Sequence, residues 1–275
     1  MHPWLRAQMV LSCWELVGRI LGTSKDDVSD DDDPDDSSLH SPLFWSRDLE
    51  KHPYGEFSFA VIKGNEVIED HSQVETGREA TFVGVYDGHG GPDASRYISR
   101  RLFRNFIISY FVFAHGWYKA SRTIGDAYMK EPEYNADPRF RRYYLPLPEP
   151  FQRPLLTPEP SLHRRVLQPS DGFVIFASDG LWENLTNQQA VDIVNKHQRA
   201  GIARKLIKRA LKEAAKKRQM NFDELLRVPD ATRRNFHDDI TVVVIFVDHD
   251  LLEKGASVPE LSVRGFGEVK VCHPM

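Results

Sequence analysis

The stretch Asp238-Asp-Ile-Thr-Val-Val-Val-Ile-Phe-Val247 places two acidic residues directly before a run of apolar and β-branched residues. Such side chains favour extended structure, so residues 240–247 are predicted to form a buried strand. Apolar runs followed by an acidic residue and glycine recur at 81–86 and 172–178. The sequence therefore predicts several strands with carboxylates at their ends. These acidic positions are Glu69, Asp70, Asp87, Asp179, Asp238 and Asp239.

Carboxylates from separate strands can converge at one edge of a sheet, where a hard cation relieves their mutual repulsion. Oxygen ligands of this kind suit Mg²⁺ or Mn²⁺ rather than zinc. Two such ions, roughly 3.5–4 Å apart, can activate a water molecule and hold a phosphoryl group. His89 lies in the glycine-rich turn 87–91 and is a candidate general acid for a leaving alkoxide.

Composition narrows the class of protein. The chain has 275 residues and a formal net charge of −4, which gives no support for a nucleic-acid binder. Its mean hydropathy of −0.46 argues against an integral membrane protein, and no transmembrane segment is expected. The two cysteines, Cys13 and Cys272, exclude a disulfide framework and favour a reducing, intracellular compartment. We expect a monomer of the nucleus or cytoplasm, with peripheral attachment to the plasma membrane left open.

The chain divides into four predicted parts. Residues 1–24 have a partly amphipathic helical pattern, and a membrane-interface or partner-docking helix is favoured equally with a helix packed on the main body. Residues 25–50 include a long run of aspartates and are predicted to be a disordered linker. A folded domain is expected over 51–249. Residues 250–275 are polar and aperiodic, which predicts a flexible tail.

Two segments of the predicted domain have helical periodicity. Residues 92–106 are predicted to form a helix over a sheet, because their apolar positions share one face. These positions are Ala94, Tyr97, Ile98, Leu102 and Phe106. Residues 200–218 form the clearest predicted helix, with one apolar face and one basic face. For the basic face, a solvated surface is favoured over a site for an anionic partner.

Four motifs, in order along the chain, resemble signature motifs of the metal-dependent type 2C (PPM) protein serine/threonine phosphatases. They are Val85-Tyr-Asp-Gly-His-Gly-Gly91, Ser121-Arg-Thr-Ile-Gly-Asp126, Ala177-Ser-Asp-Gly-Leu-Trp182 and Asp238-Asp-Ile-Thr-Val243. The resemblance covers residues 55–247. The sequence around these motifs is similar to the plant branch known for acting on the plasma-membrane proton pump. Phosphoproteins, with that pump as one candidate, are therefore the expected substrates.

The resemblance implies an α+β fold, a β-sandwich of two antiparallel sheets flanked by helices, with two Mn²⁺ or Mg²⁺ ions between the sheets. Asp87 would bridge both ions, the Gly88 carbonyl would bind one of them, and Asp179 and Asp238 would bind the other. His89 would be the general acid. The implied reaction is hydrolysis of phosphoserine and phosphothreonine in proteins by metal-activated water, without a covalent phospho-enzyme.

Other motif positions follow the family less closely. Glu69 and Asp70 would hold metal-bound waters. Asp126 and Asp239 belong to the motifs but have no assigned role, and Asp239 replaces a commoner asparagine. Family members that bind phosphate through an arginine carry it at the position of Asn65, so this chain lacks that side chain.

The central part of the family domain is missing. Only residues 92–120 lie between the turn at 87–91 and the motif at 121–126, where the family has further strands and an acidic residue for a third metal. We therefore expect an internal shortening near 107–120, an incomplete set of central strands and unpaired sheet edges. Two alternatives to an active enzyme follow. One is a catalytically inactive variant that binds partners, for example through the basic helix at 200–218, and the other is an unstable product without function.

Overall fold

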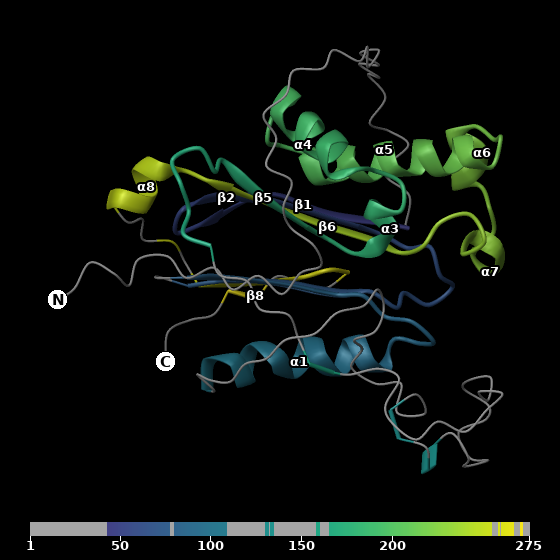
Figure 1. Cartoon of the computed structure of the whole chain (residues 1–275), viewed down its shortest axis with the longest axis horizontal. Coiled ribbons are helices and arrows are strands. Elements are labelled where there is room, and N and C mark those ends of the chain that lie inside the picture. The colour runs from purple at the N-terminus through teal and green to yellow at the C-terminus, as the bar shows by residue number, and fades with distance from the viewer. Residues whose placement is uncertain are drawn as a thin grey trace.

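The computed structural model describes residues 43–77, 80–108, 130–131, 133–134, 158–159, 165–254, 258, 260–266 and 270–271. In these residues two four-stranded antiparallel sheets pack face to face, with helices on both outer faces (Figure 1). The predicted α+β sandwich is confirmed. No described helix is both long enough and apolar enough to cross a membrane.

The first sheet has the strand order β1-β2-β6-β5. Its strands are β1 (Phe44–His52), β2 (Gly55–Ile62), β6 (Ile240–Val247) and β5 (Phe173–Ala177). All eight residues of β6 are buried, because the strand lies between two neighbours and is covered on both faces. This burial explains why 240–247 is a continuous apolar run rather than an alternating one.

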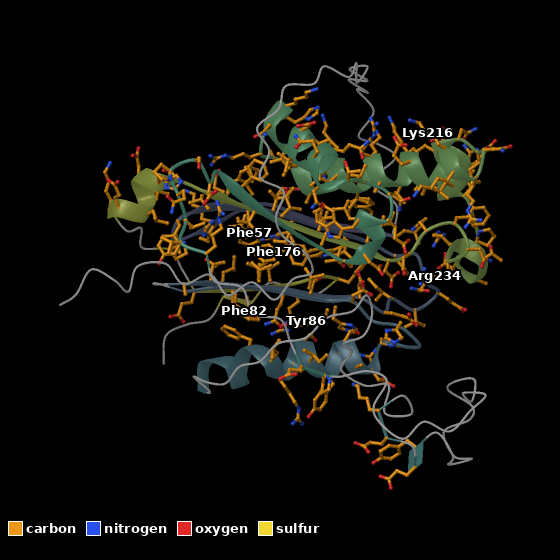
Figure 2. The ribbon with its side chains drawn as sticks, in the orientation of Figure 1. Phe57, Phe82, Tyr86, Phe176, Lys216 and Arg234 are labelled. Carbon is orange, nitrogen blue, oxygen red and sulfur yellow. The ribbon has the colours of Figure 1, made fainter. Side chains whose placement is uncertain are left out.

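The second sheet has the strand order β4-β3-β7-β8. Its strands are β4 (Thr81–Tyr86), β3 (His71–Thr76), β7 (Leu261–Arg264) and β8 (Lys270–Val271). Between the sheets lies a core that includes Phe57 and Phe176 (Figure 2). Val74 of β3 and Val263 of β7 are fully buried in the same core.

Two predicted boundaries are wrong. Strand β1 begins at Phe44, so the folded domain starts inside the segment 25–50 that was predicted to be a linker. The segment 250–275, predicted to be a flexible tail, contains helix α8 (His249–Lys254) and strands β7 and β8. Both errors have one cause: these strands are short or lie at a sheet edge, and half or more of the residues in each are polar or charged. Backbone pairing with a neighbouring strand, which leaves little trace in composition, holds them in place.

The outer face of the first sheet is covered by amphipathic helices. The helices of this half are α3 (Asp179–Trp182), α4 (Asn187–Lys196), α5 (Ile202–Lys217), α6 (Phe222–Leu226) and α7 (Asp230–Arg233). Helix α5 contacts β2 and β6, and its Leu206, Ile207 and Leu211 are fully buried. The predicted helix at 200–218 and its apolar face are confirmed.

The outer face of the second sheet is covered by α1 (Asp93–Ile108), as predicted for a helix over a sheet (Figure 1). The predicted apolar face of this helix is only partly correct. Tyr97 and Leu102 are 57% and 37% exposed, whereas Ser95 and Ser99 are buried. The helix is rotated because polar contacts fix it: the Ser95 hydroxyl donates to the Glu69 carbonyl at the start of β3.

The predicted shortening near 107–120 falls mostly outside the described residues. Among the described strands, β4 and β5 each end a sheet. Residues Phe173, Val174 and Ile175 of β5 are only half-buried, in contrast to their fully buried neighbours in β6. This partial burial at a sheet edge agrees with the expected loss of central strands.

Candidate metal and active site

The register of the second sheet brings two predicted acids together. His71, the first residue of β3, pairs with Tyr86, the last residue of β4. Because the strands are antiparallel, Asp70 just before β3 and Asp87 just after β4 lie at the same end of the sheet. Their carboxylates are near enough for Asp87 to raise the pKa of Asp70 by repulsion.

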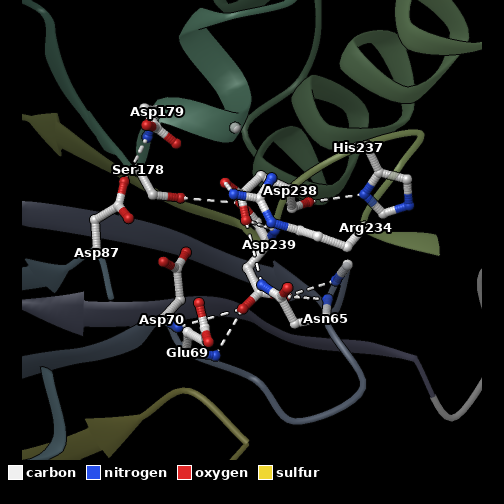
Figure 3. Close-up of polar contacts among 12 residues, drawn as sticks. Asn65, Glu69, Asp70, Asp87, Ser178, Asp179, Arg234, His237, Asp238 and Asp239 are labelled. Carbon is white, nitrogen blue, oxygen red and sulfur yellow. Dashed lines mark hydrogen bonds and ion pairs between the residues drawn. The ribbon is translucent and has the colours of Figure 1, made fainter. Parts of the chain in front are cut away.

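The register of the first sheet brings another two predicted acids together. The end of β5 pairs with the start of β6, so that Asp179 and Asp238 lie at one end of the first sheet. The packing of the sheets then joins the two pairs, because the Asp179 backbone N–H donates to Asp87 Oδ2 at 3.1 Å (Figure 3). Four carboxylates that are distant in sequence therefore meet at one end of the sandwich, as predicted.

The strand ends enclose Asp70 most tightly. Burial, and then repulsion by Asp87, raise the pKa of Asp70 well above its usual range, although hydrogen bonds from Ser178 and Thr241 oppose the shift. The Thr241 hydroxyl donates to Asp70 Oδ2 at 2.7 Å. Asp70 is thus held in a fixed orientation by a polar side chain on the otherwise apolar strand β6.

Two of the acids have pKa values near neutrality. Burial and repulsion by Asp179 and Asp238 raise the pKa of Asp87 to about 7. Because Asp87 remains exposed to solvent, we attribute more of this shift to repulsion than to burial. Burial, together with repulsion by Asp179 and Asp239, raises the pKa of Asp238 to about 6, while Arg234 opposes the shift. The cluster therefore carries more negative charge than its protein partners balance.

This donor set fits a hard divalent cation in chemical type. Its atoms are carboxylate oxygens and, at Gly88, a backbone carbonyl oxygen, which are ligands that Mg²⁺ and Mn²⁺ prefer. Within the described residues, no group of three or more acidic, histidine or cysteine side chains is arranged so that it could hold a metal ion. The fit therefore lies in the type of donor and in the unbalanced charge, not in a formed coordination shell.

Asp239, which had no assigned role, holds the segment before β3 in place. Its Oδ1 accepts hydrogen bonds from the backbone N–H groups of Gly64 and Asn65 at 2.6 and 2.9 Å. Its Oδ2 accepts from the N–H groups of Glu69 and Asp70 at 2.7 and 3.4 Å. Asp239 thereby ties the start of β6 to the segment that carries Glu69 and Asp70.

Glu69 is tied to the glycine-rich turn. Its Oε1 accepts a hydrogen bond from the Gly91 N–H at 2.8 Å, and its role toward metal-bound water stays a prediction. A Cβ atom at Gly88 would lie 2.4 Å from the Glu69 carbonyl oxygen, closer than real contacts allow. Glycine at position 88 is thus required for the turn to pack against the start of β3.

The structure places the other residues discussed in the sequence analysis as follows. His89 is exposed to solvent in the turn that follows Asp87, and its role as general acid stays a prediction. Asp126 lies outside the described residues. Asn65 uses its side chain within the protein, because its Nδ2 donates to Asp238 Oδ1 at 3.3 Å.

Sequence reasoning missed three residues that shape the site: Ser178, Thr241 and Arg234. The Ser178 hydroxyl accepts from the Thr241 N–H at 3.0 Å, which joins β5 to β6 beside the acids. Arg234 Nη2 lies 2.6 Å from Asp238 Oδ2. The first two could have been found, because each is a polar residue adjoining an apolar run within three residues of a predicted ligand. The only signal for Arg234 in the sequence was its position four residues before Asp238.

Comparisons with known proteins identify the family of this chain. The family model for protein phosphatase 2C matches residues 115–220. Probable protein phosphatase 2C 68 of Arabidopsis thaliana is 42% identical over 383 aligned positions, with 97% of this chain and 96% of that protein covered. Probable protein phosphatase 2C 25 of Oryza sativa subsp. japonica is 40% identical over 377 positions, with the same coverage.

The alignment lengths also bear on the size of the domain. With 383 aligned positions against 275 residues, at least 108 positions of the Arabidopsis relative have no counterpart in this chain. The crystal structure of serine-threonine phosphatase 2C from Toxoplasma gondii matches with 15% identity and a TM-score of 0.28, covering 70% of this chain and 55% of that chain, a likeness too weak to bear on the fold. On the plant relatives, the chain belongs to the protein phosphatase 2C family.

Proposed function

We propose that this protein hydrolyses phosphoserine and phosphothreonine esters of phosphoproteins with water activated at a site for two divalent metal ions. The observation that carries the proposal is the meeting of four carboxylates from four strand ends. Their repulsion contributes to the raised pKa values of Asp87 and Asp238. A site that accumulates negative charge in this way gains most from binding a cation.

Asp87, Asp179, Asp238 and the Gly88 carbonyl would hold the ions, and Glu69 and Asp70 would orient water next to them. When bound, Mn²⁺ or Mg²⁺ would lower the pKa of water and offset the charge of the phosphoryl group. Asp70 is suited to its role, because Thr241 fixes one of its oxygens and each carboxylate oxygen can accept more than one hydrogen bond.

His89 would donate the proton that the leaving serine or threonine oxygen requires. The side chain is exposed and follows Asp87 by two residues on a turn held at both ends. Histidine is the side chain that most often serves as a general acid in such a proton transfer. A His89→Ala variant should therefore lose more activity with an alkyl phosphoester than with an aryl phosphate, whose leaving group needs no proton.

Phosphoproteins are the proposed substrates, with the plasma-membrane proton pump as the first candidate from the resemblance to the plant branch. We further propose that the protein acts as a monomer in the nucleus or cytoplasm, or peripherally at the plasma membrane. Size-exclusion chromatography with light scattering and a fluorescent fusion in plant cells would test these statements.

The decisive experiment measures Mn²⁺ binding by calorimetry and hydrolysis of a phosphothreonine peptide in the same preparations. We expect wild type to bind Mn²⁺ and hydrolyse the peptide, and Asp179→Asn and Asp238→Asn to lose at least tenfold in both. Asp250→Asn, an exposed acid in α8, is the matched control and should behave as wild type. Mn²⁺ binding without hydrolysis in wild type would contradict the enzymatic proposal.

A second candidate function is that of a catalytically inactive binding protein. It is favoured by the 108 or more aligned positions that the chain lacks and by the absence of a formed metal group among the described residues. A cooperative thermal transition without Mn²⁺ binding would support this candidate. A non-cooperative transition would instead indicate an unstable product.

A further inference from the structure

Arg234 lies at the edge of the acidic cluster, directly after the short helix α7 (Figure 2). Its Nη2 atom is 2.6 Å from Asp238 Oδ2, and 51% of its side chain is exposed. In Figure 3 its guanidinium group points toward Asp238 and the neighbouring Asn65. A half-exposed cation therefore adjoins one of the proposed metal ligands.

The neighbouring cations are engaged in the fold. Arg233 is 4% exposed, donates to the Val228 carbonyl at 2.7 Å and pairs with Asp230 at 2.9 Å. Lys63 pairs with the same Asp230 at 3.0 Å. Of these three, Arg234 is the one that combines exposure with contact to the acidic cluster.

A cation at this place, in addition to the metal ions, would favour binding of a phosphoester substrate. The phosphate of phosphoserine or phosphothreonine carries about −1.5 to −2 charges at pH 7, and the site is lined with carboxylates that repel it. The neutral side chain of Asn65, which donates to Asp238 Oδ1, cannot offset this charge. A guanidinium group is planar and presents parallel N–H donors that match two phosphate oxygens.

We propose that Arg234 binds the phosphoryl group of the substrate while retaining its contact with Asp238. The ion pair involves Nη2, and the exposed remainder of the guanidinium group offers further N–H donors toward solvent. Arg234 is thus a substrate-binding residue for phosphate esters and for free phosphate. The inference rests on the proposed function, because it takes the phosphoester as the ligand of this site.

The test compares wild type with Arg234→Gln and Arg234→Lys, each loaded with Mn²⁺. Arg47→Gln is the matched control, because Arg47 is also exposed and also pairs with an acid close to it in sequence, Glu50. Binding of inorganic phosphate is measured by calorimetry. Binding of a peptide that carries a non-hydrolysable phosphonate analogue of phosphothreonine is measured by fluorescence anisotropy. Hydrolysis of the phosphothreonine peptide itself is measured by KM and kcat.

We expect Arg234→Gln to weaken binding of both ligands roughly tenfold or more, the loss typical of a charge-assisted contact. Arg234→Lys, which keeps the charge but not the parallel donors, should lie between Arg234→Gln and wild type. Mn²⁺ affinity should be retained or increased, because Asp238 loses a competing cation. A purely structural role would instead lower Mn²⁺ affinity and thermal stability and leave phosphate binding by the Mn²⁺-saturated protein unchanged.

Several outcomes overturn the inference. If Arg234→Gln binds phosphate and peptide as tightly as Arg47→Gln, the inference is wrong, and continued hydrolysis would leave the proposed function standing. If only peptide binding falls, Arg234 contacts the peptide and not the phosphoryl group. If wild type binds neither ligand, both proposals fail together. Should Arg234→Gln not fold, the lysine variant and its Mn²⁺ affinity still decide the question.

Discussion

The two sheets of the sandwich are covered in different ways. The first sheet packs against α5 through fully buried aliphatic side chains such as Leu206 and Leu211. The second sheet packs against α1 partly through buried serines, while Tyr97 and Leu102 of that helix remain exposed. Apolar burial therefore stabilises the first half of the molecule, and polar contacts hold much of the second half.

This difference matters because the candidate site is divided between the halves. Asp70 and Asp87 belong to the second sheet, whereas Asp179 and Asp238 belong to the first. The site is complete only while the sheets remain in register with each other. Loosening of the second half alone would then abolish metal binding while the first half stays folded.

The largest expected effect comes from the apolar half. Leu206→Ala should lower the free energy of unfolding by about 2–5 kcal/mol, because it opens a cavity in a fully buried core. The matched substitution in the other half, Leu102→Ala, removes a side chain that is 37% exposed and should change stability by no more than about 0.5 kcal/mol. Urea unfolding measures both. Equal losses would refute the contrast between the two halves.

The next effect concerns Asp239, which ties the two halves together. Asp239→Ala leaves the N–H groups of Gly64, Asn65 and Glu69 without their acceptor and should cost about 2–3 kcal/mol. Asp239→Asn keeps one acceptor oxygen and should cost about half as much. Urea unfolding, with hydrogen exchange at residues 64–70, checks the result. Unchanged exchange in the alanine variant would show that other contacts hold this segment.

A smaller effect is expected from Arg264, which lies on strand β7. It donates to Gln73 Oε1 at 2.7 Å and to the Ser99 carbonyl at 3.0 Å, and it pairs with Glu75 at 3.0 Å. Since Arg264 is 41% exposed, Arg264→Gln should cost about 1–2 kcal/mol at pH 7.5.

The pH dependence of the Arg264→Gln effect has a definite sign. Burial raises the pKa of Glu75, and Arg264 opposes that shift, so removal of the arginine raises the pKa further. A carboxyl group with a raised pKa destabilises the fold when it is ionised. Protonation of the group at low pH removes that cost. The cost of Arg264→Gln should therefore be smaller at pH 5 than at pH 7.5. A cost that grows on acidification would contradict this account.

The smallest effect concerns His52, which bridges the sheets. Its Nε2 lies 2.9 Å from the Phe246 carbonyl in β6 and its Nδ1 lies 3.3 Å from the Thr81 hydroxyl in β4. Burial lowers the pKa of His52 below the 6.5 that is usual for histidine, so the fold favours the neutral ring. Its contribution is complete above pH 6.5 and declines as the pH falls below that value, by no more than about 1.4 kcal/mol per pH unit. The difference in melting temperature between wild type and His52→Gln should narrow from pH 7.5 to 5.5.

The buried strands and helices of the fold were predictable from the sequence, but its outer and short strands and the orientation of α1 were not. Residues 240–247 form the fully buried strand that their apolar run predicts, and 202–217 form the predicted helix. Strands β1 and β7 were missed because their register depends on a neighbouring strand distant in sequence. The face of α1 was mispredicted for a similar reason, since the Ser95 contact with Glu69 outweighs an amphipathic pattern.

The sequence by itself indicated most of the carboxylates of the candidate site, because Asp87, Asp179 and Asp238 each adjoin an apolar run typical of a buried strand. Tertiary structure alone decided how they are held: Asp239 binds a backbone segment, Thr241 orients Asp70, and Arg234 reaches Asp238. The physical reason is the range of the forces involved. Hydrophobic periodicity is local and visible in a single segment, whereas hydrogen bonds and ion pairs depend on which strand ends the packing of the two sheets brings together.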